Sequence, residues 1–217
     1  MNILNDKQLK STLSGLLSPW EIATIFANRK LVESKDTREI GKSRQHAAED
    51  LVIDWMNSLS LGLNILSQKE LEEAAIDGKL PEDFNYDHNE SGFDAMCLNT
   101  GARIQIKYRG GQSIHMEQTR RSSEKNKGVA SKTGHVVYSQ GEFDILVAVR
   151  PEEISMEFDP NKDLMIFSEK NLRDHANPGF LVRSISKKTE ASLREEMKSS
   201  GTINVLNNIL KEFKKGE

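Results

Sequence analysis

Residues 92–109 read Gly-Phe-Asp-Ala-Met-Cys-Leu-Asn-Thr-Gly-Ala-Arg-Ile-Gln-Ile-Lys-Tyr-Arg. Two short runs with strand character, residues 93–98 and 103–108, flank the turn signal Asn-Thr-Gly. Because side chains alternate along a strand, Gln105 and Lys107 share the polar face of the second run. A tight turn brings Asp94 back across the ladder, about 5–8 Å from that face. The stretch therefore predicts a hairpin that gathers a carboxylate, an amide and an ammonium group at one end.

The spacing of Asp94, ten further residues, Gln105, one residue and Lys107 resembles the PD-(D/E)xK nuclease superfamily. In the usual pattern an Asp is followed by Glu/Asp-x-Lys on the next strand. Gln105 replaces the acidic residue here, as in some type II restriction endonucleases, and the Pro before the Asp is absent. The resemblance covers about residues 43–149. It implies an α/β fold with a restriction-endonuclease-like mixed central β-sheet flanked by α-helices.

The resemblance also implies a Mg²⁺-dependent endonuclease that hydrolyses phosphodiester bonds in double-stranded DNA at a specific sequence. Asp94, Gln105, Lys107 and Glu49 would be the catalytic residues, and the metal ligands would be Asp94, Gln105, the carbonyl of Ile106 and Glu49. Mg²⁺ accepts oxygen ligands and keeps several waters, so one or two carboxylates suffice. Lys107 would orient the attacking water or stabilise developing charge. Glu49 has an alternative role as a solvated acid that the helix dipole favours, and Asp50 is the alternative ligand.

Several further elements follow from local patterns. Residues 43–59 have a broad apolar face at helical spacing, whereas the polar, charged residues 33–44 are typical of a loop. Ser67 and Glu70 form a capping-box pattern at the start of a short helix. Residues 141–149 are almost continuously apolar, as expected for a strand buried on both faces in the centre of a sheet.

Basic residues are concentrated after the hairpin, although the net charge of the chain is −3. Their position beside Lys107 favours contact with DNA phosphates or bases over a solvated surface run. The segment that carries most of them, residues 112–127, is predicted to be a helix or a mobile segment. The predicted DNA-binding residues are Arg109, Arg120, Arg121, Lys125 and Lys127.

Composition limits the other possibilities. A length of 217 residues suits one domain, residues 1–217, with the nuclease core inside it. No run approaches the roughly 20 apolar residues of a membrane span, and the N-terminus lacks a signal-peptide core, so we expect a cytoplasmic protein. A single cysteine, Cys97, excludes an internal disulfide framework and a cysteine-rich zinc site.

Two other functions remain open. One is a repair or phage-type nuclease on the same fold. The other is a non-catalytic DNA-binding regulatory protein, in which a helix over residues 19–32 would read the DNA. The resemblance to enzymes that cut symmetric sites implies a homodimer. A nuclease requires a divalent cation and Lys107, whereas a regulatory protein requires neither.

Overall fold

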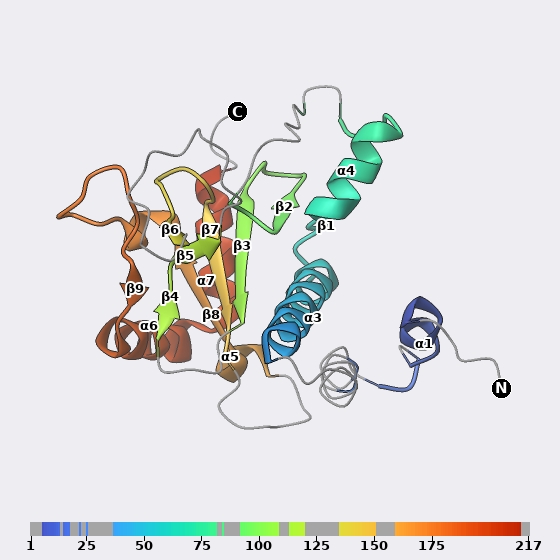
Figure 1. The fold of residues 1–217 in the computed structure, drawn as a ribbon, viewed down its shortest axis with the longest axis horizontal. Helices are drawn as coiled ribbons and strands as arrows, with labels where there is room; N and C mark the ends of the chain where they lie inside the picture. Colours follow the sequence, from blue (N-terminus) through green and yellow to red (C-terminus); the bar gives the residue numbers. More distant parts are fainter. Residues whose placement is uncertain are drawn as a thin grey trace.

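A five-stranded mixed β-sheet, in the order β1-β2-β3-β7-β8, forms the centre of the computed structural model (Figure 1). The structure describes residues 6–13, 15–17, 22, 25, 37–81, 84, 92–108, 113–119, 135–150 and 159–213. The strands of the sheet are β1 (Ile65–Ser67), β2 (Ala95–Cys97), β3 (Arg103–Tyr108), β7 (Ile145–Val149) and β8 (Leu164–Ser168). Only β3 and β7 are parallel, and the other neighbours are antiparallel. The predicted mixed sheet with flanking helices is confirmed.

The predicted hairpin is present as β2 and β3. Their chains are joined by the turn that contains Gly101, whose φ of 70° is a backbone conformation that glycine adopts without steric cost. The predicted buried strand is β7, which lies between β3 and β8 and is buried at all five positions. Its apolar run is continuous because helices or smaller sheets cover both faces of the central sheet.

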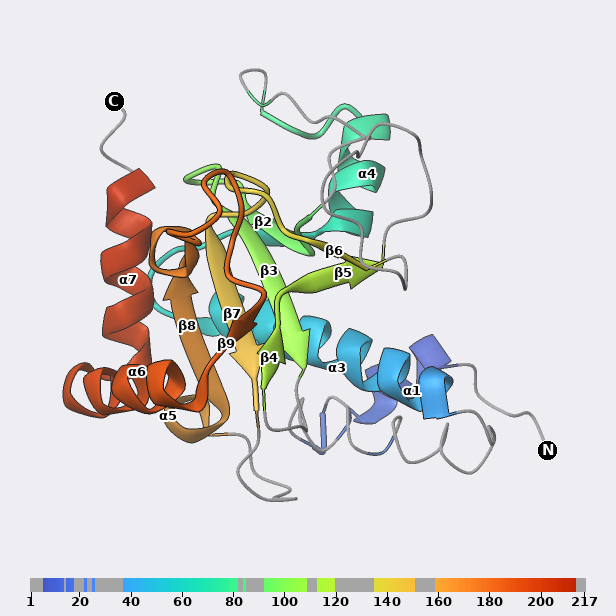
Figure 2. The ribbon, with the colours of Figure 1, turned by 60° about the vertical axis from the view of Figure 1, so that its left-hand side comes forward.

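One face of the sheet is covered by α3 (Thr37–Ser58) and α7 (Thr202–Phe213). The apolar residues of α3 that pack there include Ala48, Leu51, Val52 and Met56, at the spacing of one helical face. Full burial of a Leu, Val or Met side chain contributes about 1.5–3 kcal/mol relative to an exposed one. The helix is therefore held against β3 (Figure 2).

The start of α3 corrects one prediction. Residues 33–44 were expected to form a loop, but the helix begins at Thr37, and residues 33–36 lie outside the described part of the chain. Arg, Glu and Lys are frequent in this stretch and have high helix propensity, so a charged composition does not distinguish a loop from a polar helical turn.

The opposite face is covered by α6 (Lys187–Ser200) and by two smaller sheets. One pairs β4 (Ile114–His115) with β9 (Ser184–Ile185), and the other pairs β5 (Glu117–Thr119) with β6 (His135–Val137). The prediction of a helix or mobile segment at residues 112–127 is therefore wrong for residues 113–119. Ile114 and Met116 are both fully buried and alternate with polar neighbours, which is the periodicity of a strand.

The other helices among the described residues are α1 (Asp6–Leu13), α4 (Gln68–Ile76), α5 (Pro160–Asp163) and the 3₁₀ helix η1 (Glu169–Leu172). The capping box of α4 is confirmed, because the Ser67 hydroxyl accepts from the Glu70 N–H and the Glu70 carboxylate accepts from the Ser67 N–H. No helix in the described ranges has the length and apolar character needed to cross a membrane.

Candidate metal centre at the edge of strand β3

The candidate site lies where β2 leaves β3. The two strands pair at only two positions, Ala95 with Ile104 and Met96 with Arg103. After Ile104, side chains rather than a neighbouring strand bind the backbone groups of β3 on this edge. The Asp94 carboxylate accepts from the N–H of Ile106 (2.7 Å), and a glutamine of α3 binds the next groups along the edge. The divergence of the strands thus gathers a cluster of polar groups beside Ile106.

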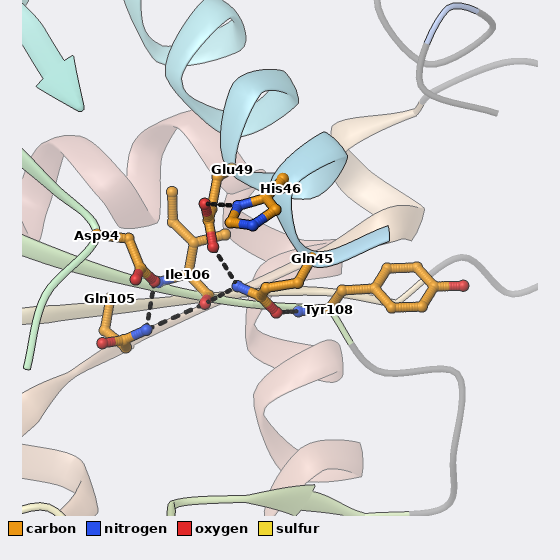
Figure 3. Close-up of polar contacts among 7 residues, drawn as sticks. All are labelled: Gln45, His46, Glu49, Asp94, Gln105, Ile106 and Tyr108. Atoms are coloured by element: carbon orange, nitrogen blue, oxygen red, sulfur yellow. Dashed lines mark hydrogen bonds and ion pairs between the residues drawn. The ribbon is translucent and has the colours of Figure 1, made fainter. Parts of the chain in front are cut away.

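Asp94 is the central acid of this cluster (Figure 3). Besides the Ile106 N–H, its Oδ2 accepts a hydrogen bond from Nε2 of Gln105. Burial raises the pKa of Asp94 to about 7, and repulsion by the nearby Glu49 carboxylate adds to the shift. The Ile106 N–H and the positive charge of Lys107 oppose it but do not cancel it. Without a bound metal ion, Asp94 therefore keeps its proton at pH values at which an ordinary carboxyl group has lost it.

Gln105 is almost fully buried, and its amide faces Asp94. Its Nε2 also donates to the Ile106 carbonyl (3.1 Å). Both partners are oxygen atoms, so the amide presents its nitrogen to them when no cation is present. A half-turn of the amide would place Oε1 among the same oxygens. Gln105 could therefore bind a metal ion through Oε1 only after this half-turn of its amide.

Glu49 of α3 lies in the same polar cluster (Figure 3). Its Oε1 accepts from Nε2 of Gln45 (2.8 Å), and its Oε2 lies 3.1 Å from Nδ1 of His46. The Glu49 side chain is 22% exposed, whereas Asp50 is exposed on the same helix. Since Glu49 also contributes to the raised pKa of Asp94, Glu49 is the acid of α3 that faces the site.

Lys107 approaches from the polar face of β3. Its Nζ donates to the hydroxyl of Tyr138 (2.7 Å) and lies 4.9 Å from the centre of that ring. Tyr138 is buried and packs edge-to-face against Phe143. The Lys107 side chain therefore packs on the Tyr138 ring, while its charge acts to lower the pKa of Asp94.

The donor atoms of this polar cluster suit a hard cation. Two carboxylates, a backbone carbonyl and an amide are oxygen donors of the kind that Mg²⁺ accepts. A cation would also relieve the repulsion between Asp94 and Glu49 that contributes to the raised pKa. Across the described segments, no group of three or more His, Cys, Asp or Glu side chains is arranged to hold a metal ion. The candidate centre is thus of a different composition, with two acids and two neutral oxygen donors.

No family model, curated protein or solved structure matches this chain. The function is consequently inferred from the geometry of the site. Of the predicted site residues, Asp94, Gln105, Ile106, Lys107 and Glu49 are brought together. The predicted DNA-binding residues Arg109, Arg120, Arg121, Lys125 and Lys127 lie outside the described residues.

Three residues of the site were missed from the sequence: Gln45, His46 and Tyr138. Gln45 and His46 precede Glu49 by four and three positions, which places them beside it on a helix. That spacing was available as a signal once the helix was predicted. Tyr138 carried no such signal, because its partner Lys107 is distant in sequence.

Proposed function

We propose that this chain is a Mg²⁺-dependent endonuclease that hydrolyses phosphodiester bonds in double-stranded DNA. The observation that carries the proposal is the convergence of Asp94 and Glu49 beside the Ile106 carbonyl. Lys107, which acts on Asp94 electrostatically, supplies a positive charge at the same place. This combination of acids, neutral oxygen donors and a lysine is suited to a reaction at a phosphate group.

Each residue of the site would have a distinct role in the reaction. When bound, Mg²⁺ would neutralise charge on the phosphate and lower the pKa of a bound water. Asp94 and Glu49 would hold the ion, and Gln105 would add a neutral oxygen. The Lys107 ammonium would orient water or stabilise charge on the phosphate oxygens. Because Gln105 carries no charge, we expect weaker metal binding than in a site with a third carboxylate.

The proposal extends to a type II restriction endonuclease of restriction-endonuclease-like fold. Its support is the position of Asp94 directly before β2 and of Gln105 and Lys107 on the adjacent strand β3, together with a parallel strand beside β3. A homodimer would suit cleavage at a symmetric site. A cytoplasmic location is part of the same proposal, since such an enzyme acts on DNA inside the cell.

The experiment is cleavage of several unmodified DNAs by the purified wild type, by Lys107→Met and by Lys69→Met, each with Mg²⁺ or EDTA. Methionine preserves much of the length of Lys107 and its packing on the Tyr138 ring, but it removes the charge. Lys69 is the matched control because its side chain is 84% exposed on α4. We expect discrete fragments that require Mg²⁺, persist in the Lys69 variant and disappear in the Lys107 variant.

Other outcomes separate the alternatives. Mg²⁺-dependent fragments without discrete ends would favour a repair or phage-type nuclease over a restriction enzyme. DNA binding that persists in EDTA, with no cleavage of any substrate, would contradict the nuclease and favour a regulatory DNA-binding protein. Equal cleavage by the wild type and the Lys107 variant would show that Lys107 takes no part in the reaction.

A further inference from the structure

We infer that Gln45 is a positioning residue of the metal centre, which fastens Glu49 of α3 to the Ile106 carbonyl of β3. The inference rests on the proposed function, because it assigns a role around the same divalent cation. Its basis is one side-chain amide that makes three hydrogen bonds to two different elements (Figure 3).

The three contacts connect the two parts of the site. Nε2 of Gln45 donates to Oε1 of Glu49 (2.8 Å) and to the carbonyl of Ile106 (2.7 Å), which is 61 residues away in sequence. Oε1 of Gln45 accepts from the N–H of Tyr108 (2.9 Å). Gln45 therefore binds two of the proposed metal ligands with one nitrogen atom and β3 with its oxygen atom.

The orientation of this amide is determined by its partners. The Tyr108 N–H can only donate, so it requires the oxygen of Gln45. The nitrogen must then face Glu49 and Ile106, both of which present acceptor oxygens. If the amide were turned over, two donors would face each other at Tyr108, and two acceptors would face each other at both Glu49 and Ile106. The Tyr108 N–H on its oxygen thus fixes the orientation of the Gln45 amide.

A fixed amide has two consequences for a metal centre. It satisfies the Ile106 carbonyl and the Tyr108 N–H of β3 where β2 no longer pairs with them. It also holds the Glu49 carboxylate at a set distance from Ile106 before any cation arrives. Residues that orient metal ligands in this way typically change metal affinity by roughly 10–100-fold when they are mutated.

The test measures Mg²⁺ binding by isothermal titration calorimetry, without DNA, for the wild type, Gln45→Met, Glu49→Ala and the double variant. Methionine has nearly the length of glutamine but makes none of the three hydrogen bonds. Gln8→Met is the matched control, since Gln8 is exposed on α1. We expect the Gln45 variant to bind Mg²⁺ roughly 10–100-fold more weakly. In the Glu49→Ala background the same change should cost much less, because part of its effect passes through Glu49.

A second measurement covers the case in which Gln45→Met does not fold in EDTA. In the wild type, the side-chain amide resonances of Gln45 should shift during a Mg²⁺ titration with the affinity found by calorimetry, while those of Gln8 should not. Mg²⁺ binding that leaves the Gln45 resonances unmoved, or that is equally tight in Gln45→Met, would overturn the inference alone. A wild type that binds no Mg²⁺ would instead overturn the proposed function.

Discussion

Replacing Asp94 by Asn removes a titrating group from the site and leaves its shape nearly unchanged. In the metal-free protein the pKa of Asp94 rises from an ordinary value of 3.8 to about 7, chiefly because the carboxylate is buried and secondly because Glu49 repels it. Between these two pH values the folded protein keeps a proton that the unfolded chain releases. The free energy of unfolding of the wild type therefore falls as the pH rises through this window and levels off above pH 7.

The size of the effect follows from the width of the window. Each pH unit inside it removes about 1.4 kcal/mol from the free energy of unfolding. Between pH 5 and pH 8 the wild type should lose about 3 kcal/mol relative to Asp94→Asn, because the asparagine amide does not titrate. Added Mg²⁺ should reverse part of this loss at pH 8 in the wild type only; an excess of about tenfold over the dissociation constant contributes about 1.4 kcal/mol.

The assay is urea unfolding in EDTA, followed by tryptophan fluorescence, at intervals from pH 5 to pH 8. Asp77→Asn is the control, because Asp77 is an exposed carboxylate after α4 and should leave the pH dependence of the wild type in place. Stability curves of the wild type and Asp94→Asn that stay parallel over the whole range would refute the reasoning. Asp94 would then ionise as an ordinary carboxyl group, and the electrostatic argument for a cation would fail.

Three further substitutions test separate parts of the structure. Gln105→Glu adds a carboxylate among the proposed ligands, so Mg²⁺ should bind about tenfold tighter or better in calorimetry; unchanged affinity would place residue 105 outside the centre. Tyr138→Phe removes the hydroxyl that accepts from Lys107 but keeps the ring, so urea unfolding should show a loss of about 1 kcal/mol. Gly92→Ala should cost about 2 kcal/mol in the same assay, because φ is 112° and the new Cβ would lie 2.8 Å from Cβ of Glu142; a neutral result would show that the backbone relaxes there.

The parts of the fold that the sequence predicted well depend on short-range chemistry. The hairpin follows from a turn signal between two strand patterns, and the helix after Ser67 follows from a capping box that closes within three residues. Strand β7 was recognisable because burial on both faces leaves a continuous apolar run. In each case the residues that determine the structure are close to one another in the chain.

The parts that the sequence did not predict depend on distant partners. The segment of β4 and β5 has only two alternating apolar residues, Ile114 in β4 and Met116 between the two strands. Such a short pattern forms strands only through pairing with β9 and β6. The start of α3 at Thr37 could not be predicted, because the charged residues there are common in both loops and helices. The spacing of Gln45 from Glu49 was a local signal, but its contacts with β3 could not be predicted, because those partners are 61 and 63 residues away.

The position of the site has a cause in the sheet itself. A strand that loses its neighbour exposes N–H and C=O groups that must find other partners. On β3 the Asp94 carboxylate binds the Ile106 N–H, and the Gln45 amide binds the Ile106 carbonyl and the Tyr108 N–H. The hydrogen bond from Ile106 lowers the pKa of Asp94, but burial and the Glu49 charge outweigh it. The side chains that close the sheet edge thus create an excess of oxygen atoms and negative charge, and this excess is the physical reason to expect a cation there.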